Sequence, residues 1–154
     1  MPLRPLPNVF VKDLKSRVKH IKFGTNPCRV RCFTQDIMFF REDILRKMRR
    51  HAIDISHADS SEESPDVTEQ LVDTLLRQAH LCPLPLGIRP IYWELDYTMR
   101  LFPLPDVLVL ADRTDQYALD LWGCNTVNPG SFSSDFSFVV YRPCTKSVEF
   151  SRVD

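Results

Sequence analysis

The chain has 154 residues, of which 44% are hydrophobic and 26% charged, so it is long enough and apolar enough for one domain with its own core. Its 20 Lys and Arg residues balance 20 Asp and Glu residues, which argues against strong autonomous DNA binding through bulk charge. No apolar run approaches the roughly 18 residues of a membrane helix, and residues 1–7 lack the apolar stretch of a signal peptide.

Glycine and cysteine usage narrow the possible functions further. The chain has only 4 Gly, and neither the GxxxxGK[ST] nor the GxGxxG phosphate-binding motif occurs in it, so P-loop and Rossmann domains lose their main support. Its 5 cysteines, an odd number without a secretory signal, predict reduced thiols. Cys28 and Cys32 would lie about 13 Å apart on one strand, too far to share a tetrahedral zinc ion. We expect no metal and no cofactor.

The first predicted elements are a helix and a β-hairpin. Apolar residues at helical spacing run from Phe10 to Val18. Residues 28–33 alternate in the manner of a half-buried strand, and residues 37–40 predict a second, more buried strand. Residues 35–36 between them are expected to form the tight turn.

A second helix is predicted from residue 41, where acidic side chains at 42 and 43 suit the positive end of the helix dipole. Basic side chains crowd its polar face, namely Arg46, Lys47, Arg49, Arg50 and His51. Such a cluster either contacts phosphate groups or forms a solvated helix face, and the zero net charge of the chain favours the solvated face.

The middle of the chain predicts a loop and then a third helix. Residues 54–64 are acidic, rich in Ser and poor in apolar residues, which indicates a mobile surface loop. Asp66 and Glu69 resemble a capping box, and the apolar stripe over residues 67–79 predicts a helix that packs into the core.

An aromatic-rich segment lies between two similar Pro-Leu-Pro turns, at residues 83–85 and 103–105, and prolines prevent one continuous helix there. Its aromatic residues are Tyr92, Trp93, Tyr97 and Phe102. They either pack onto the domain's own core or form an anchor surface for another protein, since Trp and Tyr are enriched at interface hot spots. We therefore regard them as candidate partner-binding residues.

The last part of the chain predicts strands. Residues 107–110 are a continuous apolar run, typical of a central strand buried on both faces. Residues 128–131 fit a type II turn, and further strands are expected at 136–141 and 146–150. The order of elements predicts a mixed α/β fold in which β-sheets are flanked by helices.

Three segments carry a resemblance to a known family. They are TNPCRVRCFTQDIMFFREDI at residues 25–44, QAHLCPLPLGIRPIYWELDYTMRLFPLPDVLVLADRTD at 78–115, and VNPGSF at 127–132. The chain resembles the C-terminal part of the DNA polymerase alpha/epsilon B-subunit family, in its epsilon form. The resemblance implies that residues 1–154 are the C-terminal portion of an inactive calcineurin-like phosphoesterase fold. The OB domain and the N-terminal half of that fold are expected to be absent from the chain.

The resemblance also implies where an active relative would hold metal ions. Its three metal-binding His positions fall on Arg41, Asp112 and Thr114. An Arg side chain cannot ligate a cation, and Asp112 alone lacks the partners of a dinuclear site. We therefore expect a degenerate, catalytically inactive site in which Arg41 and Asp112 form an ion pair.

The function that the resemblance implies is that of a non-catalytic accessory subunit of DNA polymerase epsilon in the nucleus. The expected partners are the catalytic subunit, the other holoenzyme subunits and the replicative helicase machinery, with DNA contacted indirectly or weakly and no membrane. Two alternatives are a B subunit of polymerase alpha or delta, and a metal-dependent phosphoesterase.

Overall fold

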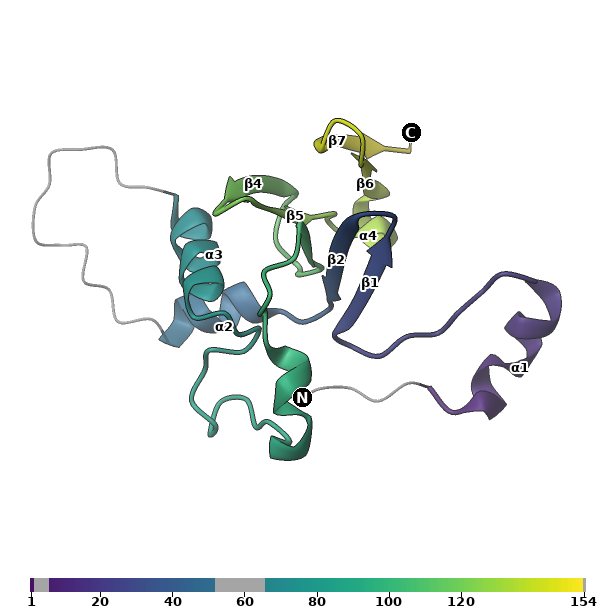
Figure 1. Ribbon diagram of the computed structural model, residues 1–154, viewed down its shortest axis with the longest axis horizontal. Helices are drawn as coiled ribbons and strands as arrows, with labels where there is room; N and C mark the ends of the chain where they lie inside the picture. The colour runs from purple at the N-terminus through teal and green to yellow at the C-terminus, as the bar shows by residue number, and fades with distance from the viewer. Residues whose placement is uncertain (2–5, 52–65, 154) are drawn as a thin grey trace, which may run out of the picture.

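A five-stranded mixed sheet forms the centre of the molecule, with its strands in the order β1-β2-β3-β5-β4 (Figure 1). The computed structural model describes residues 1, 6–51 and 66–153. The strands are β1 (Cys28–Cys32), β2 (Gln35–Phe40), β3 (Val107–Leu110), β4 (Tyr117–Leu121) and β5 (Cys124–Asn128). Strand β3 lies between β2 and β5 and runs parallel to both, while β1 and β4 complete antiparallel hairpins at the two edges.

Helices cover one face of this sheet. The helical elements are α1 (Asn8–Arg17), α2 (Ile44–His51), α3 (Val67–Arg77), the 3₁₀ helix η1 (Trp93–Met99) and the short α4 (Phe132–Asp135). Helices α2 and α3 lie together on one side of the sheet, whereas α1 stands apart beyond β1 (Figure 1). Leu108 and Leu110 of β3 join Ile44 of α2 and Leu75 of α3 in one buried cluster. The predicted mixed α/β fold with flanking helices is therefore confirmed.

The other face of the sheet is apolar but less completely covered. Side chains alternate along a strand, so Phe39 and Val109, which are paired neighbours in the parallel register, lie opposite to the core residues of β2 and β3. Phe39 is 44% exposed. A hollow of about 410 Å³ opens here, lined by these two residues and by Thr25, Asn26, Phe40, Arg41 and Ala111.

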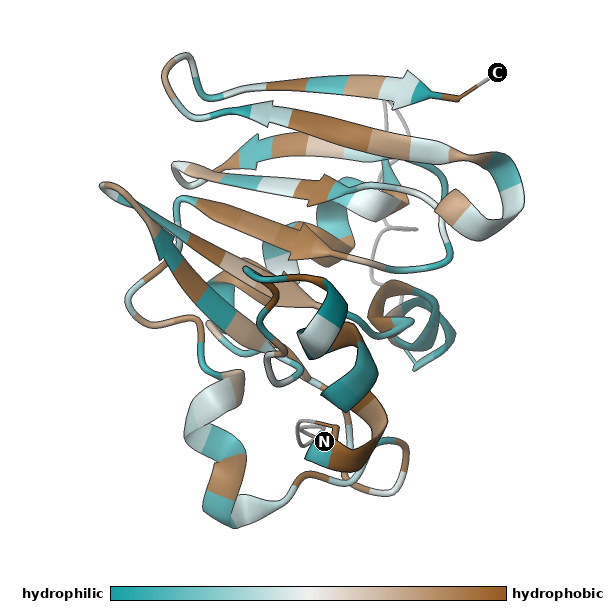
Figure 2. Cartoon of the chain, turned by 90° about the vertical axis from the view of Figure 1, so that its right-hand side faces the viewer, coloured by the Kyte–Doolittle hydropathy of each residue, from teal (hydrophilic) through white to brown (hydrophobic). Residues whose placement is uncertain are grey.

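A second, two-stranded sheet follows the first. Strands β6 (Ser137–Arg142) and β7 (Ser147–Arg152) pair antiparallel, close to the predicted ranges. This ribbon lies beside the larger sheet, which carries most of its apolar residues in the central strands (Figure 2). Two glutamine amides join the ribbon to the rest. The Nε2 of Gln35 donates to Pro143 O at 2.9 Å, its Oε1 accepts from the hydroxyl of Tyr141 at 2.9 Å, and the Nε2 of Gln116 donates to Phe138 O at 3.1 Å.

The structure corrects the predicted first hairpin and first helix. The hairpin turn lies at Phe33 and Thr34 rather than at residues 35–36, which belong to β2. The predicted helix from Phe10 is present as α1, but only part of its apolar stripe is covered, since Val11 is buried whereas Phe10 is 73% and Leu14 49% exposed.

Two further elements had no counterpart in the prediction. The hairpin formed by β4 and β5 turns at Trp122 and Gly123, both of which have positive φ. The 3₁₀ helix η1 lies within the proline-bounded aromatic segment. The predicted acidic loop at 54–64 lies outside the described residues.

Candidate functional site

The candidate site lies where the three parallel strands end. Arg41 follows β2 directly, Asp112 comes two residues after β3, and β5 ends at Asn128. Open α/β sheets bind their ligands in the crevice outside the carboxyl ends of such strands. A cavity of about 660 Å³ lies at this edge, lined by Arg41, Ala111, Asp112, Arg113, and residues 130–134.

Asp112 is buried at this edge and bonded to backbone. Its Oδ2 accepts a hydrogen bond from Leu45 N at 3.0 Å, and its Oδ1 accepts one from Arg113 N at 2.5 Å. Leu45 lies in the first turn of α2, so the carboxylate stands at the positive end of that helix. Burial raises the pKa of Asp112 above its ordinary value of 3.8, and the two backbone hydrogen bonds oppose that shift.

Arg41 does not pair with Asp112, so the predicted ion pair between them is wrong. The Arg41 Nη1 instead donates to Asp43 Oδ1 at 3.1 Å and to Ala111 O at 3.1 Å. Asp43 also approaches Arg113, with 3.6 Å between Oδ2 and Nε. The guanidinium of Arg41 is thus held by Asp43, while each oxygen of Asp112 accepts a backbone N–H group.

Thr114, the third predicted position, is held by the end of β5. The buried Asn128 donates from Nδ2 to Thr114 Oγ1 at 2.7 Å. Its Oδ1 accepts from Gly130 N at 3.0 Å, which fixes the turn that follows β5.

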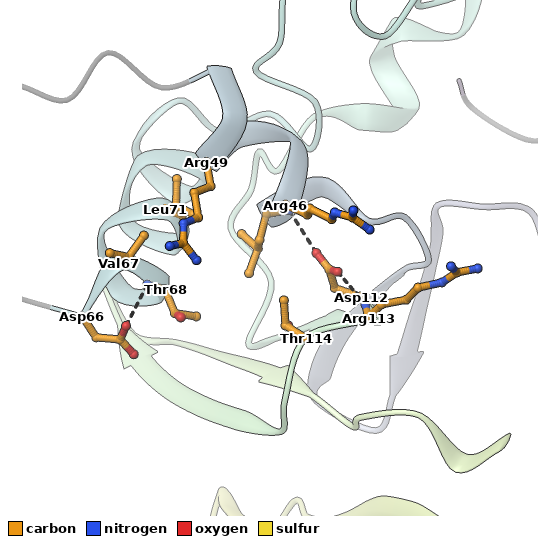
Figure 3. Close-up of a pocket in the computed structure, with 10 residues that line it drawn as sticks. Arg46, Arg49, Asp66, Val67, Thr68, Leu71, Asp112, Arg113 and Thr114 are labelled. Atoms are coloured by element: carbon orange, nitrogen blue, oxygen red, sulfur yellow. Dashed lines mark hydrogen bonds between the residues drawn. The ribbon is translucent and has the colours of Figure 1, made fainter. Parts of the chain in front are cut away.

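Asp112 therefore lines two cavities, one together with Arg41 and the other together with Thr114. Asp112 and Arg41 line the cavity of about 660 Å³. Asp112 and Thr114 line a second one of about 330 Å³ between α2 and α3 (Figure 3). Among the residues that the structure describes, no group of three or more His, Cys, Asp or Glu side chains is arranged to hold a metal ion.

Sequence reasoning missed the asparagines that hold this edge in place. Asn26 accepts from Arg41 N at 2.8 Å through Oδ1 and donates to Arg41 O at 2.7 Å through Nδ2, so it clamps the backbone after β2. Asn128 has a comparable role at Thr114. Both asparagines precede a proline, and this repeated Asn-Pro pair is the signal that could have identified them.

The four candidate partner-binding residues are all exposed. The exposed fractions are 65% for Tyr92, 69% for Trp93, 67% for Tyr97 and 84% for Phe102. These four side chains, here called the aromatic set, therefore do not pack into the core, which was the alternative interpretation of the sequence.

The backbone that carries the aromatic set is nevertheless fixed. Met99, at the end of η1, is completely buried, and its carbonyl accepts from Leu81 N at 2.8 Å. Asp96 accepts from Arg100 Nη2 at 2.9 Å and contacts His80 Nε2 at 3.2 Å. Because Cys82 N donates to His80 Nδ1, the hydrogen of the neutral ring is on Nε2 and points to Asp96.

No helix among residues 6–51 and 66–153 has the length and hydropathy that crossing a membrane requires.

The chain is similar to the B subunit of DNA polymerase epsilon from Arabidopsis thaliana, with 43% identity over 98% of this chain and 28% of that protein. It is likewise similar to DNA polymerase epsilon subunit 2 of Mus musculus and of Homo sapiens, with 40% identity over 99% of this chain and 28% of each relative. The chain thus spans between a quarter and a third of the length of these relatives.

The family model for the B subunit of DNA polymerases alpha and epsilon matches residues 1–119. This match and the named relatives confirm the predicted resemblance, including its epsilon form. The chain belongs to the DNA polymerase alpha/epsilon B-subunit family.

Proposed function

We propose that the chain acts as a non-catalytic accessory subunit of DNA polymerase epsilon and binds the catalytic subunit of that polymerase through the aromatic set. The observation that carries this proposal is the exposure of Tyr92, Trp93, Tyr97 and Phe102 on a backbone fixed by buried Met99. Aromatic side chains on a fixed backbone have few rotatable bonds to order on binding, which suits them to anchor an interface. The identity of the polymerase is inferred from the names of the relatives.

The chemistry at the strand ends supports a non-catalytic role. An active phosphoesterase of this type uses the three aligned positions as metal ligands, but Arg41 carries a fixed positive charge and is engaged by Asp43. The Asp112 oxygens accept two backbone N–H groups, and Thr114 is held by Asn128. Each side chain has a structural role that competes with metal ligation.

The less completely covered face of the sheet supports the inference that the chain is part of a larger domain. We propose that the chain is the C-terminal portion of an inactive calcineurin-like phosphoesterase fold, and that another layer covers Phe39 and Val109 in the complete subunit. The exposure of Phe39 and the hollow beside it favour such a covering layer. Its relatives are more than three times as long as the match.

The proposed setting is the replisome in the nucleus, since the relatives are named as polymerase subunits. There the accessory subunit would link the polymerase to the other holoenzyme subunits and to the replicative helicase machinery. DNA would be contacted weakly, because the net charge of the chain is zero.

The test is co-purification with the catalytic subunit of DNA polymerase epsilon. We expect Trp93→Ala to reduce recovery of that subunit at least ten-fold, because an interface Trp is commonly worth about 2 kcal/mol or more. Phe33→Ala is the matched control, since Phe33 is 92% exposed at the turn between β1 and β2, outside the aromatic set. Equal recovery with the wild type and the Trp93→Ala variant would contradict the proposed interface.

A further inference from the structure

Helix α1 presents a row of apolar side chains that the rest of the described chain leaves largely uncovered. Phe10 and Leu14 are four residues apart, and Val18 follows at the same interval directly after the helix. Their exposed fractions are 73%, 49% and 46%. Residues four apart lie on the same side of a helix, so these three side chains, here called the α1 stripe, form one exposed apolar strip.

Helix α1 has little packing of its own. It stands apart from the sheet, beyond β1 (Figure 1), and Val11 is the one buried residue among its ten. Isolated helices of this length are marginal in water, and most helical stability in proteins comes from packing of an apolar face. A second surface placed on the α1 stripe would supply the packing that this helix lacks.

The charge of the same segment indicates the chemistry of that surface. Asp13 is the one acidic residue between positions 8 and 22 of the sequence. The cationic residues of this stretch are Lys12, Lys15, Arg17, Lys19 and Lys22. Since the whole chain is neutral, this excess of positive charge is local, and it favours a negatively charged partner.

Four of these five cations have no partner in the part of the chain that the structure describes. Lys15 is engaged within the segment, where its Nζ donates to Asn8 Oδ1 at 3.1 Å and lies 5.8 Å from the centre of the Phe23 ring. The other four make no ion pair or side-chain hydrogen bond with residues 6–51 or 66–153. Their charges are therefore available to an outside partner.

One of the unpaired cations lies next to the α1 stripe. Arg17 comes three residues after Leu14, so the two lie on the same side of α1. Lys12, in contrast, is two residues from both Phe10 and Leu14, which places it on the opposite side. A carboxylate that approaches along the edge of the stripe would thus meet Arg17 before Lys12.

We propose that the α1 stripe is covered by an acidic amphipathic segment of a partner protein, whose apolar side chains pack on the stripe and whose carboxylates face Arg17 and the neighbouring lysines. Amphipathic helices commonly dock through apolar side chains at this spacing, and complementary charge steers and orients such contacts. A nucleic acid would pair with the cations but leave the stripe in water. This surface is separate from the aromatic set, and the inference does not depend on the proposed function.

The experiment measures fluorescence anisotropy with the full chain and a labelled helical peptide that carries leucine along one side and glutamate at the flanking positions. We expect this peptide to bind about ten-fold more tightly than the same peptide with lysine in place of glutamate, because only the first complements the charge of α1. Added salt should weaken its binding. Hydrogen exchange of the α1 amides should slow about ten-fold in the complex, since packing opposes local opening of the helix.

Two matched pairs of variants separate the apolar and the charged contributions. Leu14→Ala should weaken binding about five-fold through lost apolar burial, whereas Val9→Ala should leave it unchanged, because Val9 is 84% exposed on α1 but outside the stripe. Arg17→Glu should weaken binding more than Lys12→Glu does, although both reverse one charge. Unchanged circular dichroism of the variants separates a loss of binding from a loss of fold.

Three outcomes would overturn the proposal. One is equal affinity for the acidic and the basic peptide. Another is an equal effect of Leu14→Ala and Val9→Ala on binding. The third is tighter binding of the chain to a DNA duplex, or to vesicles of phosphatidylserine and phosphatidylcholine, than to the acidic peptide, which would assign the segment to a nucleic acid or a membrane surface.

Discussion

The buried carboxylate of Asp112 accepts a hydrogen bond from the backbone N–H of Leu45 at 3.0 Å, and so joins the end of the central strand β3 to the first turn of α2. The residues lie 67 positions apart in the chain. The carboxylate of Asp112, which the resemblance aligns with a metal-binding position of active phosphoesterases, therefore serves here as a helix cap supplied from another element.

Removal of this carboxylate should destabilise the fold. Asp112→Ala leaves Leu45 N and the partly buried Arg113 N without their acceptor, and an unsatisfied buried donor such as Leu45 N costs about 1–3 kcal/mol. Chemical denaturation of the wild type and the variant measures the difference in the free energy of unfolding. A variant as stable as the wild type would show that water replaces the carboxylate at no cost.

The same residue should give a specific pH dependence. Burial raises the pKa of Asp112 in the folded state, so the folded protein binds its proton more readily than the unfolded chain does. The charged form therefore costs stability above the folded pKa, and this cost disappears as the pH falls toward the ordinary value of 3.8. The stability of the wild type relative to Asp112→Asn should rise on acidification across that window, as measured by denaturation at a series of pH values. A difference that stays constant or falls would contradict the raised pKa.

The pH dependence that Asp96 contributes should have the opposite sign to that of Asp112. The hydrogen bond from Arg100, with His80 as a smaller cause, holds the pKa of Asp96 below its ordinary value of 3.8. Its contribution to the order of η1 is therefore complete above 3.8 and is lost as the pH falls through the lowered folded pKa. We expect Asp96→Asn to speed hydrogen exchange at Leu81 N, whose acceptor Met99 O ends η1, and to weaken binding of the polymerase catalytic subunit. Arg152→Gln, on the distant ribbon, provides a charge-changing control.

Two glycines with nearly the same backbone conformation should respond differently to alanine. Gly123 has φ +75° and open space where a Cβ would stand, whereas at Gly130, with φ +76°, a Cβ would meet Gln116 Cγ at 2.9 Å and Ser137 Oγ even closer. Gly123→Ala should cost about 1 kcal/mol of stability from the backbone alone. Gly130→Ala should cost a further 1–3 kcal/mol, roughly the penalty for overpacking. Equal losses in denaturation experiments would mean that Ser137 and Gln116 move aside freely.

Catalytic inactivity can be tested directly. With added Mn²⁺, the wild type and Asp112→Ala should both release no more product from a phosphodiester substrate than a blank does. The reason is that the resemblance aligns Arg41 and Thr114 with metal-binding His positions of active relatives, and an Arg side chain cannot ligate a cation. Turnover that is present in the wild type and disappears in Asp112→Ala would contradict the proposed role.

Elements whose residues agree with their environment were predictable from sequence. The run at Val107–Leu110 predicts a strand buried on both faces, and β3 has parallel neighbours on both sides. Asp66 and the apolar stripe after it predict α3, which begins with Asp66 as its cap. In both segments, local preference and tertiary packing favour the same structure.

The missed elements depend on residues in unusual conformations. Trp122 with φ +58° and Phe33 with φ +55° occupy turn positions that aromatic residues rarely adopt, so neither turn has the usual sequence signal. At the site, the sequence indicated which residues gather at the strand ends but not how they pair. Arg41 pairs with Asp43, while Asp112 accepts the N–H groups of its neighbour Arg113 and of Leu45 in α2, and sequence spacing does not reveal the contact with Leu45.

The hydrogen bonds from Gln35 and Gln116 to the β6–β7 ribbon determine which part of this molecule should unfold locally. A two-stranded sheet alone is marginally stable, so the ribbon depends on the amides of Gln35 and Gln116 that bridge it to the larger sheet. Amide protons of the ribbon should therefore exchange with solvent through a local opening that leaves β3 and α3 closed. Loss of either glutamine would then lower the protection of the ribbon while the global unfolding transition of the chain stays nearly where it was.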